Sequence, residues 1–201
     1  MSQHYFERNP ASSHKREQWS STLRGHTFRF ITDSGVFSKG EVDFGTRVLL
    51  SRINVAQLSD GGPLLDVGCG YGPIGLALAR ELPDRIVHMV DVNERALCLA
   101  KENAELNSVS NVQIYESDAG SRVTERGFEL VVTNPPIRAG KEVVHRIYED
   151  AHQLLSPKGT LWVVIQKKQG APSTLKKLEQ LFSSVDTVHK EKGYYIICAW
   201  K

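Results

Sequence analysis

Short apolar runs alternate with amphipathic stretches along the chain from Pro63 to its last residues. Runs of this length, rich in Val, Ile and Leu, are typical of buried strands, and the stretches between them have helical periodicity. The predicted strands are residues 64–67, 86–92, 112–116, 128–133 and 160–165, and the predicted helices are residues 73–82, 94–106, 141–155 and 173–182. This alternation predicts an α/β fold, Rossmann-like, with helices on both faces of a mostly parallel sheet.

The end of the chain departs from this alternation. Residues 185–190 and 194–200 are both strand-like, and the few residues around Lys192 and Gly193 leave no room for a helix between them. Strands joined so closely form an antiparallel hairpin. The sequence therefore predicts a seven-stranded, mostly parallel sheet whose last strand is reversed.

Residues 1–50 are more polar and contain no long apolar run. Within them, residues 27–32 alternate like a strand, and a helix is predicted over residues 43–58. We expect residues 1–50 to be an N-terminal extension packed on a domain formed by residues 51–201, because 201 residues suit one structural domain overall. No secretory signal and no membrane-length apolar run is present, so we expect a cytoplasmic protein.

Three cysteines are present, Cys69, Cys98 and Cys198, and they have no spacing typical of metal ligands. Buried free thiols in a reducing cytoplasm explain them, and no metal site is predicted. The net charge of +2 permits a nucleic-acid partner without requiring one.

A glycine-rich segment, Asp66-Val67-Gly68-Cys69-Gly70-Tyr71-Gly72, lies where the first of these strands passes into its helix. Glycines at such a turn let the backbone approach a ligand, and the helix N-terminus offers free N–H groups. The segment does not match the dinucleotide fingerprint G-x-G-x-x-G, because Pro73 follows Gly72 directly. This departure favours an adenosyl ligand other than NAD.

Acidic residues end the next two strands. Asp91 stands 19 residues after Gly72 (91 − 72), where a carboxylate can accept hydrogen bonds from both ribose hydroxyls of an adenosyl group. It could instead cap the helix that begins at Glu94, a place for which Asn93 competes. Asp118, followed by Ala119, can reach an adenine amino group or be a solvated turn residue.

The fourth of these strands ends in Thr133-Asn134-Pro135-Pro136-Ile137. Its two prolines remove backbone donors, so the turn presents carbonyl groups. The Asn134 side-chain oxygen and the Pro135 carbonyl can accept both hydrogens of an amino group and turn the nitrogen lone pair towards a methyl donor. An ordinary Asn-Pro turn is the alternative, but ligands bind at this edge of such sheets.

The segment DVGCGYG followed by an acid and then by NPP resembles class I S-adenosylmethionine (SAM)-dependent methyltransferases that modify amino nitrogens. GVFS at residues 35–38, DFGT at 43–46 and NPPIRAG at 134–140 extend the resemblance to the ribosomal RNA small subunit methyltransferase C family, which are guanine-N2 enzymes, and to its short single-domain relatives. The resemblance implies SAM as the cofactor and guanine N2 of small-subunit (16S) ribosomal RNA, free or in the subunit, as the substrate.

The resemblance also implies the residues of the site. The acceptor turn is Asn134, Pro135, Pro136 and Ile137. The cofactor site is Phe37, Ser38, Gly45, Thr46, Asp66, Gly68, Cys69, Gly70, Gly72, Asp91, Val92, Asp118, Ala119 and Asn134.

This sequence departs from the family pattern in two ways. Long family members have a preceding second domain that is not part of this sequence. The residue after NPP, often an aromatic that stacks on the target base, is Ile137, and Phe37 could substitute for it.

Other functions remain open at this point. The acceptor could be adenine N6 or a protein glutamine amide. An NAD-dependent oxidoreductase is disfavoured by Pro73, and a non-catalytic SAM-binding or RNA-binding module by the intact NPP turn.

Basic residues near the predicted acceptor turn could hold RNA phosphates or could simply be solvated. Lys167 and Lys168 follow the strand at residues 160–165, and Lys176 and Lys177 lie on the next helix. We expect the same face to include Arg24, Arg29 and Arg138, with Phe28 and Phe30 interleaved.

Overall fold

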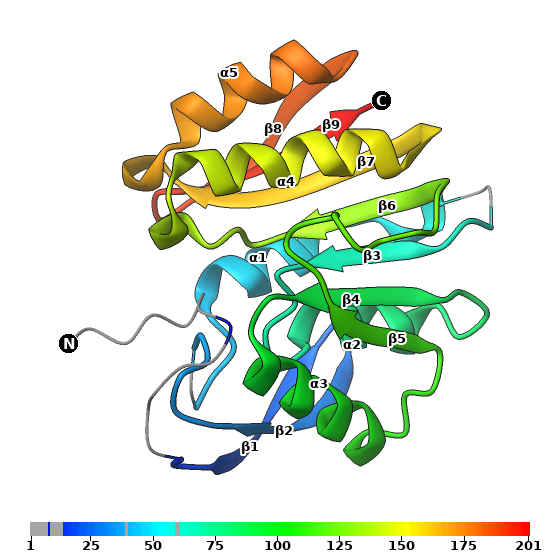
Figure 1. Cartoon of the computed structure of the whole chain (residues 1–201), viewed down its shortest axis with the longest axis vertical. Coiled ribbons are helices and arrows are strands. Elements are labelled where there is room, and N and C mark those ends of the chain that lie inside the picture. The colour runs from blue at the N-terminus through cyan, green and yellow to red at the C-terminus, as the bar shows by residue number, and fades with distance from the viewer. Residues whose placement is uncertain (1–7, 9–13, 39, 59–60) are drawn as a thin grey trace.

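The computed structural model describes residues 8, 14–38, 40–58 and 61–201. A seven-stranded sheet runs through the middle of the molecule in the order β5-β4-β3-β6-β7-β9-β8 (Figure 1). Its strands are β3 (Leu64–Val67), β4 (Val87–Asp91), β5 (Val112–Glu116), β6 (Phe128–Thr133), β7 (Leu155–Gln166), β8 (Ser184–Glu191) and β9 (Tyr194–Trp200). Neighbours from β5 to β7 pair in parallel, and β9 is antiparallel to both β7 and β8. The predicted α/β fold with a reversed last strand is confirmed.

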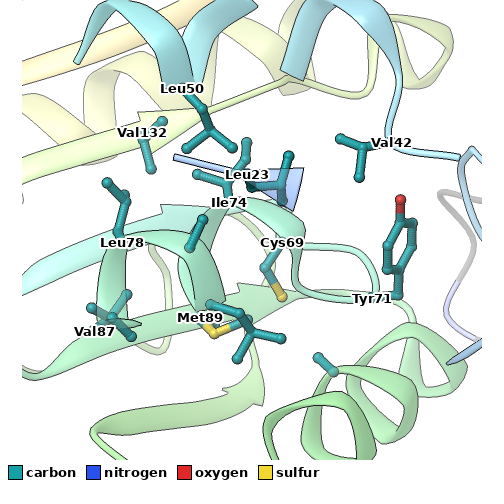
Figure 2. Close-up of a cluster of buried hydrophobic side chains, with 14 of the residues drawn as sticks. Leu23, Val42, Leu50, Cys69, Tyr71, Ile74, Leu78, Val87, Met89 and Val132 are labelled. Carbon is teal, nitrogen blue, oxygen red and sulfur yellow. The ribbon is translucent and has the colours of Figure 1, made fainter. Parts of the chain in front are cut away.

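Helices cover both faces of this sheet. The α-helices are α1 (Phe44–Arg52), α2 (Pro73–Glu81), α3 (Glu94–Leu106), α4 (Lys141–Leu154) and α5 (Ala171–Leu181), and the short 3-10 helices are η1 (Val55–Gln57), η2 (Ile137–Ala139) and η3 (Lys167–Gln169). The side chains of successive strand residues point to opposite faces of the sheet, as in any pleated strand. Leu64 of β3 packs in one cluster with α1, α2 and α3, whereas Leu65 packs in a second cluster with α4 and α5. Figure 2 shows the first cluster, where Leu50 of α1, Ile74 of α2 and Val132 of β6 meet.

An N-terminal hairpin packs against α3, and only the second of its two strands was predicted. Strand β1 (Glu17–Leu23) pairs with β2 (His26–Thr32) through a two-residue turn, Arg24-Gly25. Both turn residues have positive φ, 50° and 80°, which suits the twist of a two-residue hairpin. Strand β1 was missed because most of its side chains are polar and solvent-exposed. The helix predicted over residues 43–58 ends at Arg52 and is followed by η1.

The expected basic face that included Arg24 and Arg29 is wrong. The Arg24 side chain is only 12% exposed, pairs with Glu81 of α2 and donates from Nη1 to the Ile53 carbonyl at 2.9 Å. Arg29 donates to the carbonyl of Leu106, the last residue of α3. Helix α3 begins after the carboxyl end of β4 and runs back along the sheet, so Arg29 lies far from the edge where the parallel strands end. Phe28 and Phe30 are fully buried in the first cluster, so neither interleaves with exposed charges.

The expectation of three buried thiols holds for two of them. Cys69 and Cys198 are buried, but Cys98 is exposed on the outer side of α3, so that part of the prediction is wrong. None of the helices among the described residues is both long enough and apolar enough to cross a bilayer.

Candidate active site

A cavity of about 450 Å³ opens at the carboxyl ends of the parallel strands. This edge is where open α/β sheets bind ligands. Most of the predicted site residues line it: Phe37, Ser38, Thr46, Gly68, Cys69, Gly70, Asp91, Val92, Asp118, Ala119, Asn134, Pro135, Pro136 and Ile137. The other three, Gly45, Asp66 and Gly72, lie behind this wall.

The glycine-rich loop and Asp91 form one side of the cavity. Gly70 has φ of 57° and lines the cavity, and apart from Gly70 and its chain neighbours no described residue has an atom within 4 Å of the place where a Cβ would stand. The Asp91 carboxylate accepts from the Gly70 N–H and the Asn93 N–H, both at 2.9 Å, through different oxygens. A carboxylate has about four lone-pair sites, and the nearby Val92 N–H also stabilises its charge, so the group keeps acceptor capacity for a ligand hydroxyl.

Asp91 is not the cap of the following helix. Asn93 fills that place, because its side-chain oxygen accepts from the Ala96 N–H at 3.1 Å. Burial raises the pKa of Asp91 above its usual value. Hydrogen bonds from two hydroxyl groups would offset this cost by stabilising the charged form. A buried acceptor with lone pairs to spare fits a ribose diol.

Asp66 lies under the glycine loop, not in the cavity wall. It is fully buried, and its Oδ2 accepts from the Gly75 N–H at 2.9 Å. The first turn of α2 leaves N–H groups without helical partners, and Gly72, the N-cap residue, has no side chain to receive them. Asp66 therefore caps α2 from strand β3. The structure assigns it to holding the loop in shape.

Asp118 and Ala119 lie where β5 ends. The Asp118 side chain is 56% exposed and forms an ion pair with Arg146 of α4, so its carboxylate is shared between the cavity and that arginine. Ala119 has φ of 50°, a left-handed conformation that non-glycine residues adopt at a cost and that is frequent near binding sites.

The segment before α1 covers the cavity. Three side chains from the sheet side hold it: Asn93 donates to the Gly35 carbonyl at 2.9 Å, Arg95 to the Ser34 carbonyl at 2.6 Å, and the Tyr71 hydroxyl to the Glu41 carbonyl at 3.3 Å. Phe37 lies on this segment and is 41% exposed. The segment that the family resemblance predicts to line the cofactor site is thus anchored beside the glycine loop.

The Asn134 turn lines the cavity beside the glycine loop, because Thr133 and Val67 pair in neighbouring strands. Its two prolines have no N–H, and the Pro135 carbonyl accepts from the Ile137 N–H at 2.9 Å, which leaves one lone pair on that oxygen. The Asn134 amide nitrogen donates to the Thr46 hydroxyl at 3.1 Å and approaches the Asp43 carboxylate at 3.4 Å. No donor among the described residues occupies the Asn134 Oδ1. The turn therefore presents two acceptor oxygens, as an amino group requires.

Sequence reasoning missed an aromatic side chain and two amides in the same wall: Tyr194, Gln166 and Gln169. Tyr194 begins β9 and pairs in register with Gln166 at the end of β7. It packs so closely on Gly45 that a Cβ there would stand 2.7 Å from the Tyr194 ring. A reversed strand must begin at the edge where the parallel strands end, so the predicted topology already contained the signal for Tyr194.

Comparisons with known proteins agree with this geometry. Residues 27–198 match the family model described as methyltransferase small domain. Uncharacterized protein YbxB of Bacillus subtilis (strain 168) is 54% identical over the whole of both chains. Ribosomal RNA small subunit methyltransferase C of Hahella chejuensis is 36% identical over 145 residues, which are 70% of this chain and 41% of that protein.

One solved structure has a similar fold over almost the whole chain. It is the 16S rRNA N2 G1207 methyltransferase (RsmC) of T. thermophilus in complex with AdoMet and guanosine. The TM-score is 0.82 at 28% identity, and the match covers 96% of this chain and 52% of that one. The chain thus spans about half the length of the methyltransferase C relatives.

Proposed function

The chain belongs to the methyltransferase small domain family, and from this premise we propose that it methylates the N2 amino group of a guanine in small-subunit (16S) ribosomal RNA. It is a SAM-dependent methyltransferase with a Rossmann-like fold. The observation that carries the proposal is the pair of acceptor oxygens, Asn134 Oδ1 and the Pro135 carbonyl, in the wall of the cavity that the glycine loop and Asp91 also line.

The residues present fit SAM. Asp91 would receive the ribose hydroxyls, the Gly68–Gly70 backbone would lie against the methionine portion, and Asp118 with Ala119 would border the adenine. The segment that carries Phe37 and Ser38 would cover the cofactor. When bound, SAM would supply a methyl group from its positively charged sulfonium and be left as a neutral thioether, while the methylated nitrogen would release one proton to solvent.

The chain's own residues orient the acceptor. The lone pair of an aromatic amine is delocalised into the π system of the ring. Acceptors that hold both N–H bonds localise this lone pair on the nitrogen and direct it towards the methyl donor. Asn134 Oδ1 and the Pro135 carbonyl supply those acceptors without a strong base, so their contribution is positioning and electrostatics. A nitrogen with both hydrogens engaged cannot be base-paired, so the guanine must be flipped out or single-stranded.

Tyr194 and Ile137 would form the walls for the base. Ile137 can pack on a base but has no ring, whereas Tyr194 is an aromatic side chain that lines the same cavity. Base stacking on an aromatic side chain contributes about 1–3 kcal/mol per base. We therefore assign to Tyr194 the stacking role that an aromatic after NPP has in other amino methyltransferases.

A basic rim at the cavity mouth would hold the RNA backbone; it consists of Arg138, Lys167, Lys168 and Lys192. The Lys167 N–H donates to the Gly193 carbonyl at 2.8 Å, which joins η3 to the β8–β9 turn. Within the described part of the chain, no carboxylate lies within ion-pairing distance of the four side chains. Lys177 is different, because it pairs with Glu149 of α4. The Lys192 ammonium lies over the Phe44 ring, 4.6 Å from its centroid. Cations without a carboxylate partner suit phosphate groups.

Replacing Lys167 and Lys168 together with alanine should weaken RNA binding and make it less sensitive to salt. Each phosphate contact on single-stranded nucleic acid contributes about −0.7 to the slope of log K against log salt, so the slope should become shallower by about 1.4. Binding of labelled rRNA fragments at several salt concentrations measures it. The control is Lys101→Ala with Lys158→Ala, two exposed lysines away from the rim, and an equal change in that variant would contradict the rim.

The base assignment is tested by product analysis. Purified protein is incubated with methyl-labelled SAM and unmodified 16S rRNA or small subunits, and the RNA is digested to nucleosides. We expect label in N2-methylguanosine, since the named relatives are small-subunit rRNA enzymes. Label only in N6-methyladenosine would replace guanine by adenine, and label only on protein would remove the nucleic-acid assignment.

A further inference from the structure

The two ends of the Asn134 amide have opposite chemistry. The oxygen accepts hydrogen bonds and the nitrogen donates two, so a rotation by half a turn would replace an acceptor with a donor at the same place. The proposed chemistry needs the oxygen to face the acceptor amine. Something in the protein must therefore distinguish the two orientations.

Asp43 and Thr46 are the two side chains that contact this amide. Asn134 Nδ2 lies 3.1 Å from Thr46 Oγ1, and 3.4 Å and 3.5 Å from the two carboxylate oxygens of Asp43. A hydroxyl can donate or accept, so Thr46 tolerates either end of the amide. An ionised carboxylate only accepts, so Asp43 tolerates the NH₂ end alone.

Asp43 is itself held in place. Its Oδ1 accepts from the Thr46 N–H at 3.1 Å, and its carbonyl accepts from the Arg47 N–H at 3.1 Å, so it is the N-cap of α1. Helix α1 packs in the first cluster against the sheet, with Leu49 and Leu50 fully or almost fully buried. The carboxylate therefore stands at a fixed place beside the Asn134 turn.

We infer that Asp43 is a positioning residue that fixes the Asn134 amide with its NH₂ group inward and its Oδ1 towards the acceptor amine. The inference rests on the proposed function only in requiring an amine as acceptor, whether guanine, adenine or amide. Asp43 does not touch the reacting atoms. It acts through Asn134, and it couples the segment before α1 to the acceptor turn.

The variant Asp43→Asn separates this role from helix capping. Asparagine is as good an N-cap as aspartate, so α1 is kept. Its own amide keeps the Oδ1 that caps α1, and it places an NH₂ group where Oδ2 stood, 3.5 Å from Asn134 Nδ2. This second donor opposes the Asn134 NH₂ group and favours a rotation that presents that NH₂ group, a donor, to the donor hydrogens of the substrate. We expect turnover to fall at least tenfold, with SAM affinity within twofold of the wild type.

A double-mutant cycle tests the coupling. In the Asn134→Ala background there is no amide to orient, so Asp43→Asn should lower turnover no further. Equal fold losses in both backgrounds would show that Asp43 acts independently of Asn134 and would overturn the inference. Ser51→Ala is the control on the same helix, because the Ser51 hydroxyl donates to the Val48 carbonyl within α1 and does not line the cavity. It should retain most of the turnover, and a loss as large as that of Asp43→Asn would also contradict the inference.

A second measurement needs no catalysis. The Asn134 side-chain NH₂ resonances are identified by NMR from their loss in Asn134→Ala. In the wild type these protons should show nuclear Overhauser contacts to the Thr46 methyl group, and in Asp43→Asn these contacts should disappear. Wild-type protons without such contacts would sink the inference even if Asp43→Asn failed to fold. If they are present but no RNA is methylated, the proposed function fails and the orientation by Asp43 stands.

Discussion

Asn134→Ala should lower the turnover of methyl transfer about 100-fold or more. The side chain supplies one of the two acceptor oxygens of the turn, and losing a preorganised polar contact at a reacting centre has an effect of this size. SAM affinity should change little, because Asp91, the proposed ribose ligand, ends β4, which lies two strands away from β6 in the sheet. Single-turnover rates with saturating RNA measure the first quantity, and calorimetry measures the second.

The matched control for this variant is Asp91→Ala. It removes the buried carboxylate that faces the proposed ribose position and keeps the acceptor turn, so it should weaken SAM binding by about 1–3 kcal/mol. Asn134→Ala should thus lower mainly the turnover, and Asp91→Ala should lower mainly the affinity for SAM. Near-wild-type turnover in Asn134→Ala would refute the acceptor role of the turn, whatever the substrate.

The seven-stranded sheet could be predicted from the sequence because each of its strands contains one apolar or alternating run, although β7 begins at Leu155, five residues before the predicted start. The positions of the glycine loop, Asp91 and the NPP turn followed, since each stands directly after a strand and parallel strands end at one edge. The sequence did not predict the strand order or the path of the segment before α1, and these two features bring the residues around one cavity.

The misassigned residues have physical reasons as well. Arg24 is charged and looked exposed, but an ion pair with Glu81 keeps it mostly buried, and pairing between residues 57 positions apart leaves no local pattern. Asp43 entered the sequence analysis only as part of a family segment, because its contact with Asn134 spans 91 positions. Charge pairs and orienting contacts depend on tertiary structure, whereas strand ends depend on local apolar patterns.

Asp66, on β3 beneath the glycine loop, shows how a buried carboxylate can lower the stability of the fold. Burial raises the pKa of its carboxyl to about 7, with a further contribution from the charge of Asp91. In the unfolded chain an aspartate has a pKa of about 3.9. Between these values the native protein holds a proton that the unfolded chain has released. The contribution of Asp66 to the free energy of unfolding therefore falls as pH rises from about 4 to about 7, and it levels off above that.

Asp66→Asn should remove this contribution. The amide oxygen can still accept from the Gly75 N–H, and the side chain is neutral at every pH. Near pH 4 the variant and the wild type should be similarly stable. By pH 8 the variant should be the more stable by a few kcal/mol, because each pH unit over which only the native state is protonated costs the wild type about 1.4 kcal/mol.

Urea unfolding of the SAM-free protein at several pH values from 4 to 8 measures the difference between the two proteins. Asp91, whose pKa is raised in the same direction, contributes equally to both and cancels. Asp84→Asn, on the exposed loop after α2, is the control and should change stability by less than about 0.5 kcal/mol at every pH. If Asp66→Asn were instead the less stable protein at pH 8, the carboxylate would be ionised in the native state. Its attraction for the N-terminus of α2 would then outweigh its burial.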